Sequence, residues 1–112
     1  YTFNPHLIPS FRGILSSIYI NKKKNVPLNR IVKALKSFYK NNYFINVYKP
    51  NTQMGTGNVL NTNFCDISVC QTRLKNKIVI FSAIDNLIKG AAGQAIQNMN
   101  LLYNLKENSG LK

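Results

Sequence analysis

The sequence predicts one small α+β domain, a largely antiparallel sheet with helices on one face. First, the chain has 112 residues, of which 45% are hydrophobic and 16% charged, which suits a single packed core and argues against disorder. Second, β-branched apolar runs alternate with two runs at helical spacing. Third, no apolar run approaches the roughly 20 residues that cross a bilayer, so we expect no membrane span. Two cysteines without a disulfide pattern are typical of a cytoplasmic protein.

The first half of the chain predicts a strand, a helix and a second strand. Residues 11–20 are rich in Ile, Leu, Ser and Tyr and follow two prolines, which is typical of an irregular approach and then a strand. Residues 28–39 repeat apolar side chains at three-and-four spacing, and Pro27 suits a first helical turn, so we expect an amphipathic helix there. Residues 44–48 predict a short strand that Pro50 ends.

The middle of the chain predicts a hairpin. A polar loop with Gly55 and Gly57 follows the short strand, and the pair lacks the third glycine of a dinucleotide fingerprint. Residues 59–70 read as extended, 73–77 as a polar turn, and 77–84 as a β-branched strand. The two extended runs should pair antiparallel.

A long helix should close the chain, over residues 85–103. Asp85 is a plausible N-cap, and the apolar residues beyond it share one stripe. Gly90 and Gly93 frame a run of small residues near its start, and each glycine lowers helix stability by about 1 kcal/mol relative to alanine. Close packing against the sheet explains such a run, and so does a cofactor or another domain approaching the backbone. The residues alone do not rank the two explanations.

The charge balance raises the question of nucleic-acid binding. The chain carries 15 Lys and Arg against 3 Asp and Glu, a formal charge of +12. Codon bias toward Lys, Asn and Ile explains much of this excess, and only Lys22, Lys23 and Lys24 are contiguous, where a nucleic-acid binder usually clusters its cations. A basic nucleic-acid-binding module is kept as an alternative function.

Two cysteines and one histidine are the remaining candidates for chemistry. Cys65 and Cys70 lie five residues apart in a predicted strand, so they face opposite sides; we expect reduced structural thiols and no metal site. His6 lies between two prolines, which restrict its ring, and Arg12 follows six residues later, next to Gly13. Together the histidine and the arginine suit acid/base chemistry on an anionic substrate.

Three blocks of sequence resemble a known family. The segments FNPHLIPSFRGIL, TNFCDI and AIDNLIKGAAGQAIQNMNLL, in this order and at these intervals, are similar to the C-terminal third of the N-acetyl-gamma-glutamyl-phosphate reductases. This family is related to the aspartate-semialdehyde and glyceraldehyde-phosphate dehydrogenases. The resemblance implies the α+β catalytic and dimerisation domain of an NADPH-dependent enzyme of arginine biosynthesis.

The resemblance also implies roles for single residues. In such enzymes a cysteine thiolate attacks an acyl phosphate, phosphate leaves, and the thioester accepts hydride from NADPH to give a semialdehyde. The family histidine falls on His6, as general acid/base, and the family arginine on Arg12, as a substrate-binding residue. The small-residue helix returns to the cofactor domain in related enzymes, which makes Gly93 and Gln94 the candidates for binding NADP(H).

The same resemblance sets expectations for the whole protein. Residues 1–84 should belong to the catalytic and dimerisation domain, and 85–112 should be a helix returning to an absent NADP-binding domain. The family's Gly-Cys-Tyr-like nucleophile motif and its glycine-rich loop do not occur in the chain, so we expect the fragment alone to be inactive. A chain without the cofactor domain exposes the face which that domain covers, so we expect a homo-oligomer. Related aminoadipyl- and aspartyl-phosphate reductases remain alternatives.

Overall fold

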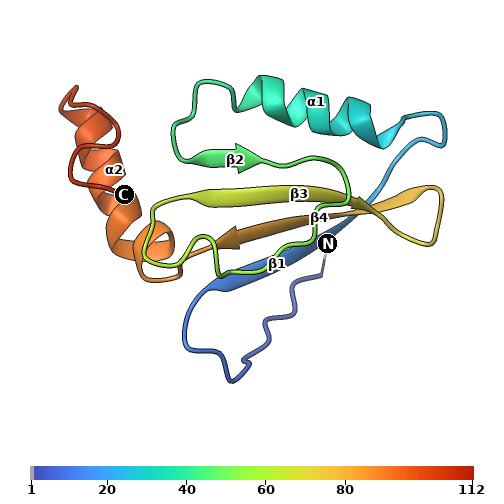
Figure 1. Ribbon diagram of the computed structural model, residues 1–112, viewed down its shortest axis with the longest axis horizontal. Coiled ribbons are helices and arrows are strands. Elements are labelled where there is room, and N and C mark those ends of the chain that lie inside the picture. The colour runs from blue at the N-terminus through green and yellow to red at the C-terminus, as the bar shows by residue number, and fades with distance from the viewer. Residues whose placement is uncertain (1) are drawn as a thin grey trace.

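A computed structural model of the chain describes residues 2–112 and has a four-stranded sheet with helices beside it (Figure 1). In chain order the elements are β1 (Ile14–Asn21), α1 (Leu28–Phe38), β2 (Ile45–Val47), β3 (Cys65–Gln71), β4 (Lys77–Ile84), a π-helix η1 (Ile88–Ala92) and α2 (Gly93–Leu102). The predicted order of strand, helix, strand, loop, hairpin and helix is confirmed. The fold class is α+β.

The sheet is mixed, so the prediction of a largely antiparallel sheet is wrong. Its strand order is β1-β4-β3-β2, with β4 antiparallel to both β1 and β3. The predicted β3–β4 hairpin is thus confirmed. β2, however, pairs parallel to β3. The reason lies in residues 48–64, a connection long enough to bring the chain back and enter β3 in the direction of β2.

The core lies between α1 and one face of the sheet. Val32 of α1, Val69 of β3 and Ile78 of β4 form its buried centre. Half-buried side chains of α1, β2 and β4 pack around it: Leu28, Ile31, Leu35, Val47 and Ile80. The three-and-four spacing of the helix and the alternation of the strands therefore meet in one layer, as the sequence predicts.

The 48–64 connection covers part of the opposite face. Ser68 on β3 donates its hydroxyl to the backbone oxygen of Thr52, at 2.7 Å. Val59 is fully buried, and its backbone oxygen accepts from the backbone N–H of Thr62 in a turn. The predicted extended run 59–70 is therefore wrong over its first residues, because Asn61 adopts a left-handed conformation (φ 62°) and the strand begins only at Cys65.

The final helix differs from the prediction in three ways. Its first part, η1, is a π-helix in which Gly90 N–H bonds to Asp85 O, and α2 follows from Gly93. α2 lies beyond one end of the sheet, so only α1 covers a face (Figure 1). Most of the apolar stripe predicted over residues 87–103 faces solvent, and the side chains that α2 buries are polar, Gln97 and Asn100. The exposed members of the stripe are Leu87, Ile96, Met99, Leu102 and Tyr103.

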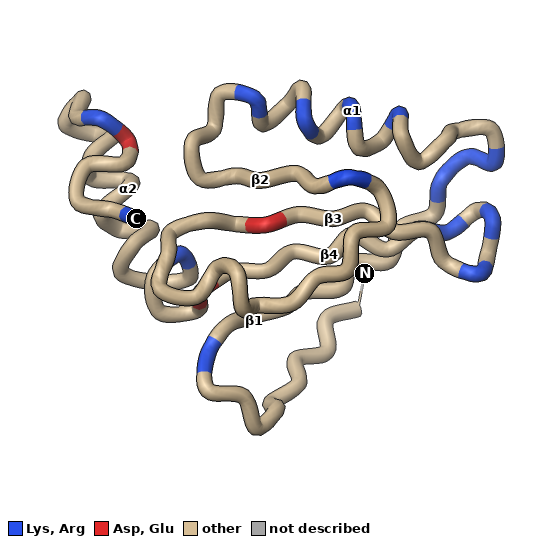
Figure 2. Tube along the Cα trace, in the orientation of Figure 1, with Lys and Arg blue, Asp and Glu red and all other residues tan. Residues whose placement is uncertain are grey.

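Basic residues dominate the surface, since they outnumber the acidic residues by 15 to 3 and all three carboxylates accept hydrogen bonds from other parts of the chain. Asp66 accepts from Asn46 and Tyr48, at 2.9 Å each, Asp85 is buried, and Glu107 accepts from a glutamine of α2. Lys and Arg follow α1 and the turns at one end of the sheet (Figure 2). The β1–α1 and β3–β4 turns adjoin there, since Lys22 N–H bonds to Asn76 O, at 2.8 Å.

Candidate catalytic pocket around His6 and Arg12

The segment before β1 forms a pocket of about 280 Å³ that contains His6. Residues 6–8 and 10–14 line it, together with Asn86 from the segment after β4. His6 is exposed, and its Nδ1 lies 3.1 Å from the backbone oxygen of Asn4. Because a carbonyl oxygen only accepts, Nδ1 is the donor in this contact. The predicted acid/base residue therefore lies in an open pocket.

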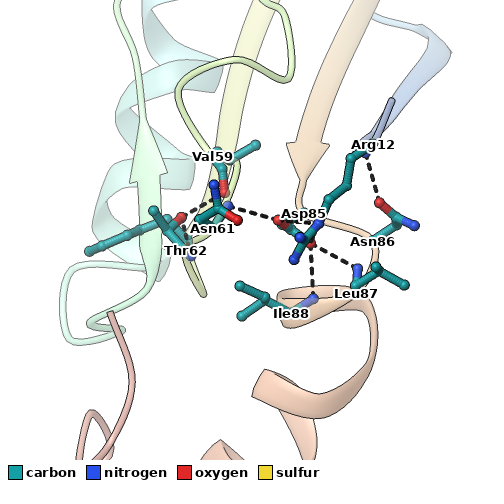
Figure 3. Close-up of polar contacts among 10 residues, drawn as sticks. Arg12, Val59, Asn61, Thr62, Asp85, Asn86, Leu87 and Ile88 are labelled. Carbon is teal, nitrogen blue, oxygen red and sulfur yellow. Dashed lines mark hydrogen bonds and ion pairs between the residues drawn. The ribbon is translucent and has the colours of Figure 1, made fainter. Parts of the chain in front are cut away.

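Arg12 lines the same pocket as His6, and its guanidinium forms an ion pair with Asp85 (Figure 3). Its Nε lies 2.9 Å from Asp85 Oδ2 and 3.0 Å from Oδ1. Asp85 is fully buried, whereas 19% of the Arg12 side chain is exposed. Since the guanidinium group is planar, the bonds at Nε also fix the plane of the two Nη groups. These hydrogen bonds engage Nε, not the Nη groups that bind an anion bidentately.

The Asp85 carboxylate is a junction between three parts of the chain. Oδ1 accepts from the backbone N–H groups of Leu87 and Ile88, at 2.8 and 3.0 Å, and Oδ2 accepts from Asn61 N–H at 2.8 Å. Asp85 thus makes the hydrogen bonds expected of a capping residue, but the first turn is π-helical and its N-cap position is Leu87, two residues after the predicted one. Burial alone would raise the pKa of Asp85, but the three backbone N–H donors and Arg12 outweigh it and hold the pKa below its ordinary value.

Asn86 holds the same loop one residue further on. Its Oδ1 accepts from the backbone N–H of Gly13, at 2.7 Å. Gly13 has φ +103°, and a Cβ there would lie 2.6 Å from Thr56 Cβ, so both its conformation and its surroundings require glycine. No local pattern in the sequence predicts the contacts of Asn86 and Thr56, because they join residues far apart in the chain.

The two predicted cofactor residues lie outside this pocket. Gly93 is buried, and a Cβ at this position would lie 2.6 Å from Ile88 Cγ2 and still closer to Asn63 Oδ1. Close packing within the chain is therefore reason enough for glycine at this position. Gln94 is half-buried on α2 and donates its amide to Asn98 Oδ1, at 2.9 Å.

A second polar cluster attaches α2 to η1, to the 48–64 connection and to the segment that follows α2. Asn63 donates Nδ2–H to Gln97 Oε1 at 2.9 Å, Lys89 Nζ donates to the same oxygen at 2.6 Å, and Gln97 Nε2 donates to Glu107 at 2.6 Å. Lys89 Nζ also lies 5.6 Å from the centre of the Phe44 ring. Burial lowers the pKa of Lys89, against the opposing fields of Cys65 and Glu107.

Three further expectations from the sequence concern the cysteines, a metal site and a membrane span. Cys65 and Cys70 are both free and stand on opposite faces of β3, near Ser82 and Ser68 respectively. Within residues 2–112, no three His, Cys, Asp or Glu side chains gather closely enough to hold a metal ion. None of the helices in this range is long and apolar enough to cross a bilayer.

Comparison with known proteins shows the family. Residues 1–86 match the family described as semialdehyde dehydrogenase, dimerisation domain. The chain is 46% identical over 109 residues to an N-acetyl-gamma-glutamyl-phosphate reductase of Thermoanaerobacter pseudethanolicus, and 50% identical over 110 residues to one of Clostridium botulinum. These matches cover 97% and 98% of the chain but 32% of each relative. A reductase of the same name from Geotalea daltonii is 48% identical, again over 32% of its length. The chain therefore belongs to the family of semialdehyde dehydrogenase dimerisation domains.

Proposed function

We propose that this chain is the C-terminal part of an NADPH-dependent reductase that converts N-acetyl-glutamyl phosphate to N-acetyl-glutamate semialdehyde in arginine biosynthesis. The names of the similar reductases support the reaction, and their length supports a chain about three times as long. The observation that carries the proposal for this chain is the open pocket that His6 and Arg12 share.

In this proposal His6 is the general acid/base. The unprotonated Nε2 of His6 first accepts the proton of a cysteine thiol from the rest of the protein. The resulting thiolate attacks the acyl carbon, and phosphate leaves. The protonated ring later returns its proton to the developing oxyanion. The hydrogen bond from Nδ1 to Asn4 supports this assignment, because it sets the tautomer that leaves Nε2 as the base.

Arg12 binds an anionic group of the substrate through its Nη groups. Its bond to Asp85 engages Nε, which leaves the forked end of the guanidinium for a phosphate or carboxylate. In this proposal the guanidinium binds the substrate through its Nη groups while its Nε stays paired with Asp85. The assignment fits its place in the lining of the pocket beside His6.

NADP(H) supplies the hydride when bound, and most of its site belongs to the absent N-terminal domain. Residues 1–84 form part of the catalytic and dimerisation domain, and 85–112 return toward the cofactor domain. The exposed apolar stripe of α2 supports this division, because a stripe of this size on a free helix indicates a surface that another domain covers. Gln94 has the donors and acceptor that match a carboxamide, and Gly93 lets the backbone come close to Asn63.

The full-length protein forms a homo-oligomer in the cytoplasm, according to this proposal. The family is described as a dimerisation domain, and both faces of the edge strand β1 are exposed in the single chain. An aminoadipyl-phosphate or aspartyl-phosphate reductase is the related alternative. Comparing kcat/KM for the three semialdehydes in the phosphate-dependent reverse reaction distinguishes them.

The test is His6→Asn in the full-length protein that contains this chain. We expect turnover to fall by about 10²-fold or more while the fold and the NADPH dissociation constant stay unchanged, because only proton transfer is lost. Ser10→Ala is the matched control, since Ser10 is exposed in the same pocket and should leave turnover unchanged. Turnover in His6→Asn equal to that of the wild type would contradict the proposal.

A second candidate is binding of nucleic acid at the basic end of the molecule. The hydrogen bond between Lys22 and Asn76 brings two lysine-containing turns together that lie far apart in the sequence (Figure 2). If RNA or DNA binds there, the affinity should fall steeply as salt rises from 50 to 200 mM, by about 10³-fold or more for six phosphate contacts. A reductase domain should bind no nucleic acid tightly at moderate salt.

A further inference from the structure

Two consecutive residues after β4 hold the loop that carries His6 and Arg12. Asp85 binds Arg12 through its carboxylate, and Asn86 binds the backbone of Gly13 through its amide oxygen. Both contacts join positions 73 residues apart in the chain. The loop is therefore fastened at two neighbouring points, directly before it enters β1.

We propose that Asp85 and Asn86 are positioning residues for the reaction, which set the place and orientation of the pocket loop 6–13. This inference rests on the proposed function, because it assigns a role in the same pocket. Neither residue needs to touch the reacting atoms. Each acts through the loop that carries the acid/base group and the anion-binding group.

The Asp85 contacts orient the guanidinium of Arg12. The carboxylate is fully buried, and backbone N–H groups of Asn61, Leu87 and Ile88 fix its position. A carboxylate with so many donors has little freedom to rotate, so it is a rigid anchor for Nε. The plane of the guanidinium, and with it the direction of its Nη groups, follows from this anchor.

The Asn86 contact fixes the end of the loop. Gly13 has a backbone conformation that side-chain-bearing residues rarely adopt, and Thr56 packs against it. The bond from Gly13 N–H to Asn86 Oδ1 satisfies the backbone donor at this bend. Its loss leaves the donor unpaired and lets the loop shift, and a shift of about 1 Å in a catalytic group is enough to cost on the order of 10²-fold in rate.

Asn86 is the better residue for a test, because Asp85 also caps the helix and its removal leaves Arg12 without a partner. In the full-length protein, Asn86→Leu removes the acceptor at similar size, whereas Asn86→Asp keeps an acceptor in the same place. We expect Asn86→Leu to lower kcat by about tenfold or more at saturating substrate, with the NADPH dissociation constant unchanged. Asn86→Asp should restore kcat to within about threefold of wild type, although its added charge raises KM for an anionic substrate.

Hydrogen exchange at the Gly13 amide gives a readout that is independent of activity. Exchange should accelerate in Asn86→Leu and return toward the wild-type rate in Asn86→Asp. Should Asn86→Leu fail to fold, Asn86→Ala removes the same acceptor with less bulk. Faster exchange together with lower kcat, both restored by Asp, supports the proposal.

Three results would overturn it. Faster exchange with unchanged kcat means that the loop position does not limit the reaction. Equal losses of kcat in the Leu and Asp variants, with normal exchange in the latter, mean that Asn86 acts on the substrate directly. Unchanged exchange and kcat in Asn86→Leu mean that the bond does not hold the loop. An inactive wild-type protein with the expected pattern of exchange would refute the proposed function, and with it the catalytic role of the loop, while leaving the fastening itself intact.

Discussion

Alanine at Gly93 should destabilise the protein, although alanine normally stabilises a helix. At most helical positions Gly→Ala gains about 1 kcal/mol. At Gly93 the new Cβ would lie 2.9 Å from Ile88 O and 2.6 Å from Ile88 Cγ2, and closest of all to Asn63 Oδ1. The Ile88 side chain can rotate, but its backbone oxygen is part of the π-turn, and Asn63 is fully buried and bonded to Gln97.

The expected magnitude follows from these contacts. Forcing a methyl group into a packed interior costs about 1–3 kcal/mol, which outweighs the helical gain. Gly90→Ala is the matched control in the same helical segment, because its Cβ would meet Asp85 O and Ile84 Cδ1 at an ordinary 3.5 Å. Gly90→Ala should therefore raise the free energy of unfolding by about 0.5–1 kcal/mol. The two variants should differ by about 2 kcal/mol.

Urea unfolding of the two variants in the full-length protein measures this difference, provided that the m-values agree. Equal shifts of the two midpoints in the same direction would refute the steric argument. The NADPH dissociation constant, measured on the same proteins, tests the cofactor explanation. If Gly93→Ala weakens NADPH binding strongly while the urea midpoint stays, the glycine serves the cofactor and not the packing of α2 against Asn63.

The remaining predictions concern titration and cofactor binding. The pKa of Asp85 is lower in the folded protein than in the unfolded chain, so the carboxylate stabilises the fold fully above its ordinary pKa of 3.8, and this stabilisation is lost as the pH falls through the folded pKa. In Asp85→Asn the free energy of unfolding should therefore lose this dependence on pH, which acid unfolding curves measure. Burial lowers the pKa of Lys89, so we expect one lysine signal in NMR of the ¹³C-methylated protein to titrate at a lower pH than the others. This signal should be missing from the spectrum of Lys89→Arg, and a common titration midpoint for all lysines would contradict the prediction. Gln94→Ala should raise the NADPH dissociation constant at an unchanged melting temperature, whereas Asn98→Ala, which removes only its neighbour on α2, should leave the constant near wild type.

The sequence predicted those elements whose pattern is local and long enough. The three-and-four spacing over residues 28–39 locates α1, and the paired β-branched runs locate the β3–β4 hairpin. β2 has only three residues, Ile45–Val47, which offer no alternation from which to choose a neighbour or a direction. Its parallel pairing with β3 therefore depends on the path of the following loop, which no local pattern reveals.

The candidate site divides in the same way. The prolines around His6 and the nearby Arg12 marked the pocket, because they lie within one short segment. The residues that hold the pocket in place, Asp85 and Asn86, come from the other end of the chain, and long-range pairs leave no trace in spacing. The spacing of the final helix predicted its apolar stripe but not which face of the helix would be buried. The polar side chain of Gln97 is buried instead, because Asn63 and Glu107 form hydrogen bonds with it.

The amide contacts beneath α2 have a consequence for how accurately that helix is placed. Hydrogen bonds are directional, and the bond from Asn63 to Gln97 matches at one register of α2 against the 48–64 connection, while Asn100 binds the backbone of Glu107 and Ser109 just after the helix. A slip of one residue along the helix axis would break the bond to Asn63 and leave a buried amide unpaired. α2 is therefore held at one register against the 48–64 connection, so the exposed side chains on its outer face are presented in a fixed position and orientation.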